Sequence, residues 1–287
     1  MSETQRVAVE TFRKLHAEGC FVIPNPWDAG SAVYLRHLGF KALATTSSGF
    51  AFTKAMLDDA PSVDAVLAHV REIVQATPLP VNADFRHGYA DAPEGVAENV
   101  TRCIATGVAG LSIEDSTDNS AEPLYDIQLA VERIKAARRA IDASGTPVVL
   151  TARCEAWLTG DPNAFAVSIE RLTAYAEAGG DCLFAPGVAN PSEIEAIVKA
   201  VAPKPVNVLM SRPHPNLTVA KLAELGVRRI SVGSALARVA WGSFMRAAQA
   251  IATTGTFDSL GEGAAFAELN QVFKNLTRVI APTRQEQ

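Results

Sequence analysis

The sequence predicts a (β/α)8 TIM barrel, of the α/β class, and three observations favour it. Eight short apolar runs recur along the 287 residues, each followed by a longer amphipathic or alanine-rich stretch. This alternation is typical of parallel strands joined by crossover helices. A glycine-containing phrase recurs at the ends of several helical stretches, and no low-complexity linker divides the chain. Eight β/α units without a long interruption fit a closed barrel better than an open sheet.

The apolar runs locate the expected strands. In order they are FVIPN from Phe21, ALATT from Ala42, PVNAD from Pro80, GLSIED from Gly110, VVLTARCE from Val148, CLFAPG from Cys182, PVNVL from Pro205 and RISVG from Arg229. The repeated phrases HLGFKAL, ATGVAGL, EAGGDCL and ELGVRRI precede four of them, and each places a glycine where a helix C-cap needs positive φ. These phrases are therefore interpreted as the α-to-β turns of the barrel.

The C-terminal part of the sequence contains more helix than an eighth unit requires. We assign residues 1–234 to the barrel core, and residues 235–287 to C-terminal helices that complete the barrel and pack on a partner subunit. Two helical stretches there carry apolar stripes, which include Trp241, Phe244 and Phe266. Because one barrel offers little surface to cover them, we expect at least a dimer with helix exchange.

Composition excludes several functional classes. A net charge of -5 and a pI near 5.6 provide no broad positive field for nucleic acid or an anionic membrane. The N-terminal stretch lacks a signal-peptide pattern, and no apolar run approaches the length of a membrane span. The four cysteines are far apart with no CxxC pair, so neither zinc nor a disulfide framework is indicated. We expect a cytoplasmic protein whose ligand is a small molecule.

Polar side chains follow several of the strands, where TIM barrels carry their chemistry. Asp84 and Glu114 end neighbouring strands and form a candidate site for a hard divalent cation, although each could instead cap a helix or pair with an arginine. Arg153 and Glu155 share one face of the fifth strand. They could pair with each other, or Arg153 could bind a substrate carboxylate with its planar fork.

Two further segments are candidates for substrate binding. The TTSSG segment offers the hydroxyl groups of Thr46, Ser47 and Ser48 as a cradle for carboxylate or phosphate oxygens. Such clusters also mark ordinary turns. Asn207 ends the seventh strand and is included among the substrate-binding candidates.

The combination of PNPWDAGSAVYLRHLGFKALATTSSG, ADFRHGYAD, GLSIED and TARCEAW resembles the isocitrate lyase and phosphoenolpyruvate mutase superfamily, over roughly residues 20–215. The resemblance implies a barrel that often exchanges its last helix between subunits of a homodimer or homotetramer. It also implies Mg2+ (or Mn2+) and a 2-oxo or 2-hydroxy acid whose C-C or P-C bond is cleaved or formed through an enolate.

Individual residues match the pattern of this superfamily. Asp84 matches the direct metal ligand, and Glu114 matches an acid that reaches the metal through water. Residues 46–48 fall in the segment that holds the substrate carboxylate, and Arg153 matches the arginine that binds the oxo acid. Asp58 matches a catalytic acid on the mobile loop after the second strand.

The chain departs from the superfamily pattern at two places. Arg86 stands where a second acid is common, two residues after Asp84. If strand geometry continues past Asp84, Arg86 lies on the same face and binds a second substrate anion; the alternative is a surface pair with Asp91 or Glu94. The segment EDSTDNSAEPLYD after the fourth strand has neither the lysine nor the cysteine of classical isocitrate lyases, so no catalytic cysteine is expected.

These observations predict a Mg2+-dependent lyase that cleaves a C-C bond next to the oxo or hydroxy carbon of a small 2-oxo or 2-hydroxy mono- or dicarboxylic acid. Decarboxylation of the oxaloacetate type is included. One alternative is a phosphonate P-C bond hydrolase or a phosphoenolpyruvate mutase-like enzyme. Another is a catalytically silent protein that binds a small acid and has lost the metal because of Arg86.

Overall fold

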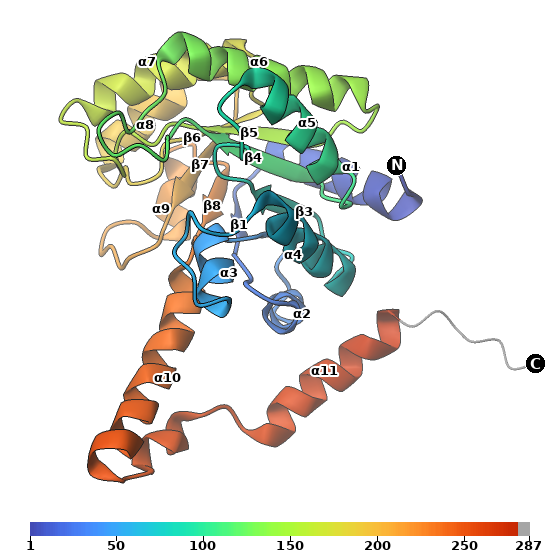
Figure 1. Cartoon of the computed structure of the whole chain (residues 1–287), viewed down its shortest axis with the longest axis vertical. Helices are drawn as coiled ribbons and strands as arrows, with labels where there is room; N and C mark the ends of the chain where they lie inside the picture. Colours follow the sequence, from blue (N-terminus) through green and yellow to red (C-terminus); the bar gives the residue numbers. More distant parts are fainter. Residues whose placement is uncertain (281–287) are drawn as a thin grey trace, which may run out of the picture.

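Eight parallel strands form a nearly closed barrel, as the apolar runs predict. The structure is a computed structural model and describes residues 1–280 (Figure 1). The strands are β1 (Phe21–Ile23), β2 (Leu43–Ala44), β3 (Val81–Asp84), β4 (Gly110–Glu114), β5 (Val149–Arg153), β6 (Cys182–Phe184), β7 (Val206–Leu209) and β8 (Arg229–Ser231). Their order in the sheet is β1-β8-β7-β6-β5-β4-β3-β2. The backbone N-H of Ala44 donates to the carbonyl of Pro24 over 3.1 Å, which joins the two ends of the sheet.

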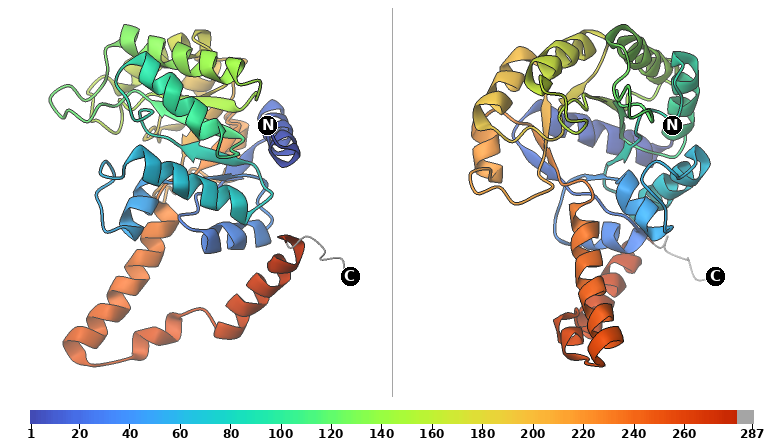
Figure 2. Two further views of the ribbon diagram at one scale, coloured as in Figure 1. Left: turned by 45° about the vertical axis from the view of Figure 1, so that its right-hand side comes forward. Right: turned by 60° about the vertical axis from the view of Figure 1, so that its left-hand side comes forward.

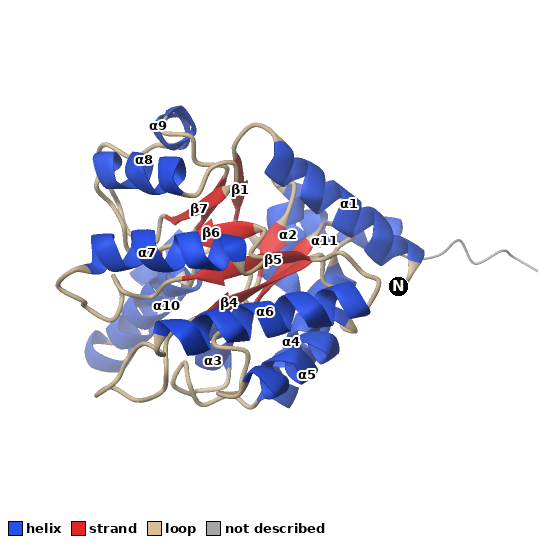
Figure 3. Cartoon of the chain, turned by 90° about the horizontal axis from the view of Figure 1, so that it is seen from above, coloured by secondary structure: helices blue, strands red, loops and turns tan. Residues whose placement is uncertain are grey.

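Helices surround the barrel on its outer face (Figure 3). They are α1 (Glu3–Ala17), α2 (Ala29–His37), α3 (Ser47–Thr53), α4 (Val63–Ala76), α5 (Pro93–Ile104), α6 (Ile127–Ala143), α7 (Ala164–Glu177), α8 (Pro191–Ala200) and α9 (Val219–Glu224). The glycines of the four repeated turns have positive φ, as predicted: Gly39, Gly107, Gly179 and Gly226. An L-residue there would be strained, so these glycines allow each helix to end and the next strand to begin.

A polar cluster inside the barrel closes the floor beneath the strand ends. The buried Arg229 side chain donates from Nε to Asn207 Oδ1 over 2.9 Å and from Nη2 to Thr151 Oγ1 over 3.0 Å. Its Nη1 lies 3.2 Å from His16 Nε2. Burial lowers the pKa of His16 to about 3, so the neutral ring accepts from Arg229. The cluster therefore ties β5, β7, β8 and α1 together without a buried carboxylate.

The C-terminal helices project away from the barrel. Helix α10 (Ala235–Thr254) runs outward, a 3-10 helix η1 (Asp258–Glu262) follows, and α11 (Phe266–Ile280) returns to contact α2 (Figures 1 and 2). Large apolar side chains are exposed along this arm, among them Val239, Phe244, Phe257 and Phe266. The predicted boundary at 234/235 coincides with the start of α10, whereas residues 281–287 of the predicted segment lie outside the described residues. Exchange of these helices with a partner subunit stays a prediction.

No helix within residues 1–280 combines the length and the apolar character that crossing a membrane requires.

We expect the purified protein to be at least a dimer at micromolar concentration, because a partner subunit would cover the apolar side chains that are exposed on α10, η1 and α11. Phe244 is 60% exposed on α10, and Phe244→Glu should weaken the association and shift the molar mass towards the monomer. Light scattering measures the mass. Gln249→Glu, at an exposed position on the same helix, is the control and should leave the wild-type mass unchanged. A wild-type monomer would contradict the prediction.

Candidate active site

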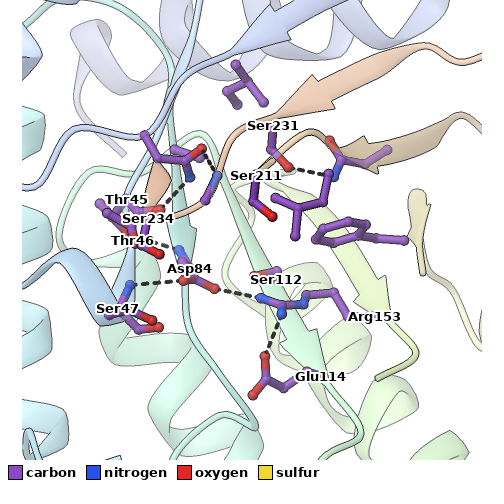
Figure 4. Close-up of a pocket in the computed structure, with 18 of the residues that line it drawn as sticks. Thr45, Thr46, Ser47, Asp84, Ser112, Glu114, Arg153, Ser211, Ser231 and Ser234 are labelled. Carbon is purple, nitrogen blue, oxygen red and sulfur yellow. Dashed lines mark hydrogen bonds and ion pairs between the residues drawn. The ribbon is translucent and has the colours of Figure 1, made fainter. Parts of the chain in front are cut away.

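A cavity of about 300 Å3 lies at the C-terminal ends of the strands, and every strand or the segment after it contributes to its wall (Figure 4). The residues predicted for the site that line it are Thr46, Ser47, Ser48, Asp58, Asp84, Glu114, Arg153 and Asn207. The barrel therefore brings together residues that are separated by more than half of the sequence. Arg86 is not among the lining residues.

The centre of the site is an arginine surrounded by three carboxylates. Arg153 Nη1 lies 2.8 Å from Asp84 Oδ1, and its Nη2 lies 3.2 Å from Glu114 Oε2. Its Nη2 also lies 2.7 Å from Glu155 Oε1. Phe184, at the end of β6, packs against the guanidinium, and Arg153 Cζ lies 5.1 Å from the centroid of the Phe184 ring. The sequence allowed Arg153 either to pair with Glu155 or to bind a substrate carboxylate. In the structure the guanidinium pairs with Glu155 and also lines the cavity.

The charges of this cluster do not balance, since one guanidinium meets three carboxyl groups. Burial raises the pKa of Glu155 to about 8, against the lowering effect of Arg153. Burial likewise raises the pKa of Glu114, and the negative charge of Asp84 raises it further. Burial acts to lower the pKa of Arg153, because it disfavours the charged guanidinium. The surrounding carboxylates of Glu155, Glu114 and Asp84 outweigh this effect and raise the pKa. The site is thus poor in positive charge.

The segment after β2 fixes Asp84 from the other side. The backbone N-H of Ser47 donates to Asp84 Oδ2 over 2.9 Å, and the N-H of Asp84 donates to Thr45 Oγ1 over 2.9 Å. Thr46 caps α3, because its hydroxyl oxygen accepts from the N-H of Gly49. Ser48 Oγ donates to Asp58 Oδ2 over 2.7 Å, which brings the acid predicted on the loop after β2 to the cavity wall.

The donor set of the site fits a magnesium ion held mostly by water. No group of three or more His, Cys, Asp or Glu side chains within the described part of the chain could hold a metal ion. Mg2+ nevertheless needs only one or two carboxylates, and each Asp84 oxygen retains acceptor capacity beyond its bond to Arg153 or to Ser47. Glu114 is held by Ser116, whose Oγ donates to its Oε1 over 2.9 Å. Asp84 can therefore serve as a direct ligand, with Glu114 as an acceptor for a bound water.

The expected position of Arg86 is wrong. Strand β3 ends at Asp84, and Arg86 has a φ of 43°, so strand geometry does not continue and the two side chains do not share a face. Arg86 Nη2 lies 2.8 Å from Asp118 Oδ1, in the segment after β4, rather than beside Asp91 or Glu94. His87 Nε2 lies 3.8 Å from the other oxygen of Asp118. Arg86 therefore links the two segments after β3 and β4 beside the cavity.

The remaining predicted residues have structural contacts. Asn207 lies at the floor of the cavity, where its side-chain N-H donates to Ser231 Oγ over 2.9 Å. Cys154 is buried against Ser168 of α7, outside the barrel interior, as its alternation with Arg153 and Glu155 predicts. None of the cysteines is among the residues that line the cavity.

Sequence reasoning missed several polar lining residues on the opposite side of the mouth. Among them are Ser211 and Arg212 after β7, and Ser234 and Arg238 at the start of α10. Their position just after the seventh and eighth strands is a signal that could have identified them.

Comparison with known proteins places this chain in a family. A family model described as phosphoenolpyruvate phosphomutase matches residues 12–252, and the chain belongs to this family. A solved structure from Burkholderia cenocepacia J2315, provisionally assigned as a lyase/mutase, is 45% identical with a TM-score of 0.91, covering 95% of this chain and 98% of that one.

Two curated relatives have named activities. A 2-methylisocitrate lyase of Halalkalibacterium halodurans is 26% identical over 259 residues, covering 88% of this chain and 85% of its own. An oxaloacetate decarboxylase of Rhodopseudomonas palustris BisA53 is 32% identical over 213 residues, covering 70% and 68%. The superfamily resemblance and the expectation of an enzyme of its lyase type are confirmed.

Replacing Arg86 should loosen the segment after β4. Arg86→Met removes the ion pair with Asp118, so amides of residues 116–126 should exchange hydrogen faster, by roughly tenfold for a lost charged hydrogen bond. Hydrogen-exchange mass spectrometry measures this. Arg102→Met, which breaks the pair with Asp64 between α4 and α5, is the control and should leave that segment unchanged. Equal exchange in wild type and Arg86→Met would show that the pair does not hold the segment.

The proton on Glu155 should make stability depend on pH. Since the folded protein raises its pKa from 4.5 to about 8, the unfolding free energy of the metal-free protein should fall as pH rises through that interval. Glu155→Gln keeps an acceptor for Arg153 but cannot titrate, so its curve should be flatter. Urea unfolding with EDTA at pH values within the interval measures both proteins, and parallel curves would contradict the assignment.

Proposed function

We propose that this protein is a Mg2+-dependent lyase that cleaves a C-C bond next to the oxo or hydroxy carbon of a small 2-oxo or 2-hydroxy acid. Decarboxylation of the oxaloacetate type falls within this proposal, and Mn2+ is expected to replace Mg2+. The observation that carries it is the contact of Arg153 with both Asp84 and Glu114 on the wall of a small cavity.

Arg153 is suited to bind the reacting end of such an acid. Its guanidinium presents parallel N-H groups that match a carboxylate, or a carboxylate and a neighbouring oxo oxygen. The hydroxyl groups of Thr46, Ser47 and Ser48 lie on the same wall, beside Asp84. An acid bound between these two groups would have its reacting carbon held close to Asp84 and Glu114.

Bond cleavage leaves an electron pair on the substrate, and the negative charge spreads to the oxygen on the neighbouring carbon. Arg153 stabilises this charge because its guanidinium is fixed in advance by Glu155 and is largely screened from solvent. A bound Mg2+ would act as a Lewis acid towards the same oxygen. The segment after β4 is tied to the segment after β3 beside the site by the ion pair of Arg86 with Asp118.

A lyase is favoured over a phosphonate hydrolase or a mutase by the curated relatives, which are named 2-methylisocitrate lyase and oxaloacetate decarboxylase. Residues 115–126 lack the lysine that the superfamily pattern places near this segment for both P-C chemistry and classical isocitrate cleavage, so the lyase proposed is a non-classical one. A silent binding protein is the remaining alternative, and it differs from a lyase by having no Mg2+-dependent turnover.

Asp84→Asn tests the proposal. In a screen of 2-oxo and 2-hydroxy acids with and without Mg2+, we expect wild type to release pyruvate or a related oxo acid only with the metal. Asp84→Asn should lower turnover by about 100-fold or more, because stabilisation of the developing charge is lost. Asp64→Asn, which removes a surface acid that pairs with Arg102, is the control. Undiminished turnover in Asp84→Asn would contradict the role of this carboxylate.

A further inference from the structure

Asp115 directly follows Glu114 at the end of β4, but it is not among the residues that line the cavity. Its side chain is buried, and its Oδ2 accepts hydrogen bonds from two residues of α7. Tyr175 donates its hydroxyl proton over 2.6 Å, and Arg171 Nη1 donates over 3.1 Å. The guanidinium of Arg171 compensates the buried charge. Asp115 is therefore a paired carboxylate that joins β4 to α7 behind the site.

The other oxygen of Asp115 holds the backbone of the segment after β5. The N-H of Val149, on β5, donates to the carbonyl of Ala109 over 3.0 Å, and alternate N-H groups of a strand face the same neighbour. The N-H of Glu155 would therefore next meet the carbonyl of Asp115. That carbonyl instead accepts from the N-H of Tyr125 over 2.9 Å. The N-H of Glu155 donates to Asp115 Oδ1 over 2.8 Å, so a side chain takes the place of the carbonyl.

Glu155 connects this backbone contact to the guanidinium at the centre of the site. Glu155 Oε1 accepts from Arg153 Nε over 2.8 Å and lies 2.7 Å from Arg153 Nη2. The terminal nitrogens of Arg153 reach Asp84 and Glu114, and Figure 4 shows them between these two carboxylates. A continuous series of contacts thus leads from α7 through Asp115 and Glu155 to Arg153.

We propose that Asp115 is a positioning residue, which fixes Glu155 and thereby sets the orientation of Arg153 towards the substrate. The inference rests on the proposed function, in which Arg153 stabilises the charge that develops on the substrate. Such stabilisation requires donors that are aimed in advance, and a small displacement of a catalytic group can lower turnover by about 100-fold. Without Asp115, the contacts with Asp84 and Glu114 would keep Arg153 in the cavity, but its orientation would be less well defined.

The chain provides a matched control near the other end of β5. Asp181 Oδ2 accepts from the N-H of Leu150 over 2.9 Å and from Arg138 Nη1 over 3.1 Å. Asp181 therefore binds a strand N-H and a helix guanidinium, as Asp115 does, but it does not line the cavity and holds no residue of the site. Asp181→Ala shows what the loss of such a carboxylate does to stability alone.

The Nε-H signal of Arg153 reports the orientation of the guanidinium without any ligand or turnover. In the 1H-15N spectrum of the arginine side chains of the full chain, this signal is the one that Arg153→Met removes. Asp115→Ala should shift or broaden it, because the bond from Arg153 Nε to Glu155 loosens. Asp181→Ala should leave it unchanged. An unchanged signal in Asp115→Ala would overturn the inference, whatever the turnover.

Steady-state kinetics with Mg2+ test the consequence for the reaction, using the acid that wild type turns over fastest in the screen. Asp115→Ala should lower kcat by about tenfold or more and change KM by less than about threefold, since Arg153 stays in the cavity but is misaligned. Asp181→Ala should lower the melting temperature and keep the wild-type kcat. In a Glu155→Ala background, Asp115→Ala should lower kcat by less than about twofold more, because the connection to Arg153 is already broken.

The outcomes separate this inference from the proposed function. A wild-type kcat in Asp115→Ala, or fully additive effects of Asp115→Ala and Glu155→Ala, would overturn the positioning role. A wild type without Mg2+-dependent turnover would contradict the proposed function instead, and the Nε-H signal would still decide whether Asp115 orients Arg153.

Folding of each variant is verified by thermal melting. Because Asp115→Ala leaves the charge of Arg171 buried without its partner, a variant that does not fold is replaced by Asp115→Leu/Arg171→Met/Tyr175→Phe. This variant substitutes apolar side chains for the whole cluster and still leaves the N-H of Glu155 without its acceptor. The same change of signal and the same loss of kcat are expected of it, and wild-type values would overturn the inference.

Discussion

The arrangement of the site depends on one buried guanidinium. Arg153 contacts Asp84 from β3, Glu114 from β4 and Glu155 just after its own strand. These contacts fix the relative positions of three neighbouring strand ends, and they leave an excess of carboxylate that burial makes costly. A divalent cation and an anionic substrate would together relieve this imbalance, since the cation compensates Asp84 and Glu114 while the substrate takes the donors that Arg153 turns away from Asp84. The same interaction therefore organises the strand ends and, in the proposed function, receives the ligand.

The barrel could be predicted from the sequence because its signals are local and repeated. Each strand is a short apolar run, and each return turn carries a glycine such as Gly107 or Gly226 whose positive φ only that residue adopts easily. The strand ends then determined which residues meet, so Asp84, Glu114 and Arg153 were correctly gathered at one mouth. The position of the C-terminal arm was not predictable in this way, because nothing local specifies where an apolar stripe finds its partner.

Other parts of the site depend on contacts between segments that the sequence does not reveal. Arg86 was placed by extending the strand beyond Asp84, but a positive φ turns the chain there, and Asp118 from a distant segment captures the side chain. Arg212 and Arg238 lie in segments without a recognisable motif, and only their position after the seventh and eighth strands points to the cavity that they line. Sequence patterns therefore predicted which polar residues gather at the strand ends, but they did not predict how charge is distributed around the whole mouth.

A crystal of the full chain soaked with Mn2+ and a small 2-oxo acid tests the central claim most directly. Anomalous scattering locates the metal without assuming its ligands. The account predicts one strong peak within coordination distance of an Asp84 oxygen, about 2.2 Å, with Arg153 turned from Asp84 towards the acid. A peak elsewhere, or an acid bound while Arg153 keeps its contact with Asp84, would contradict it.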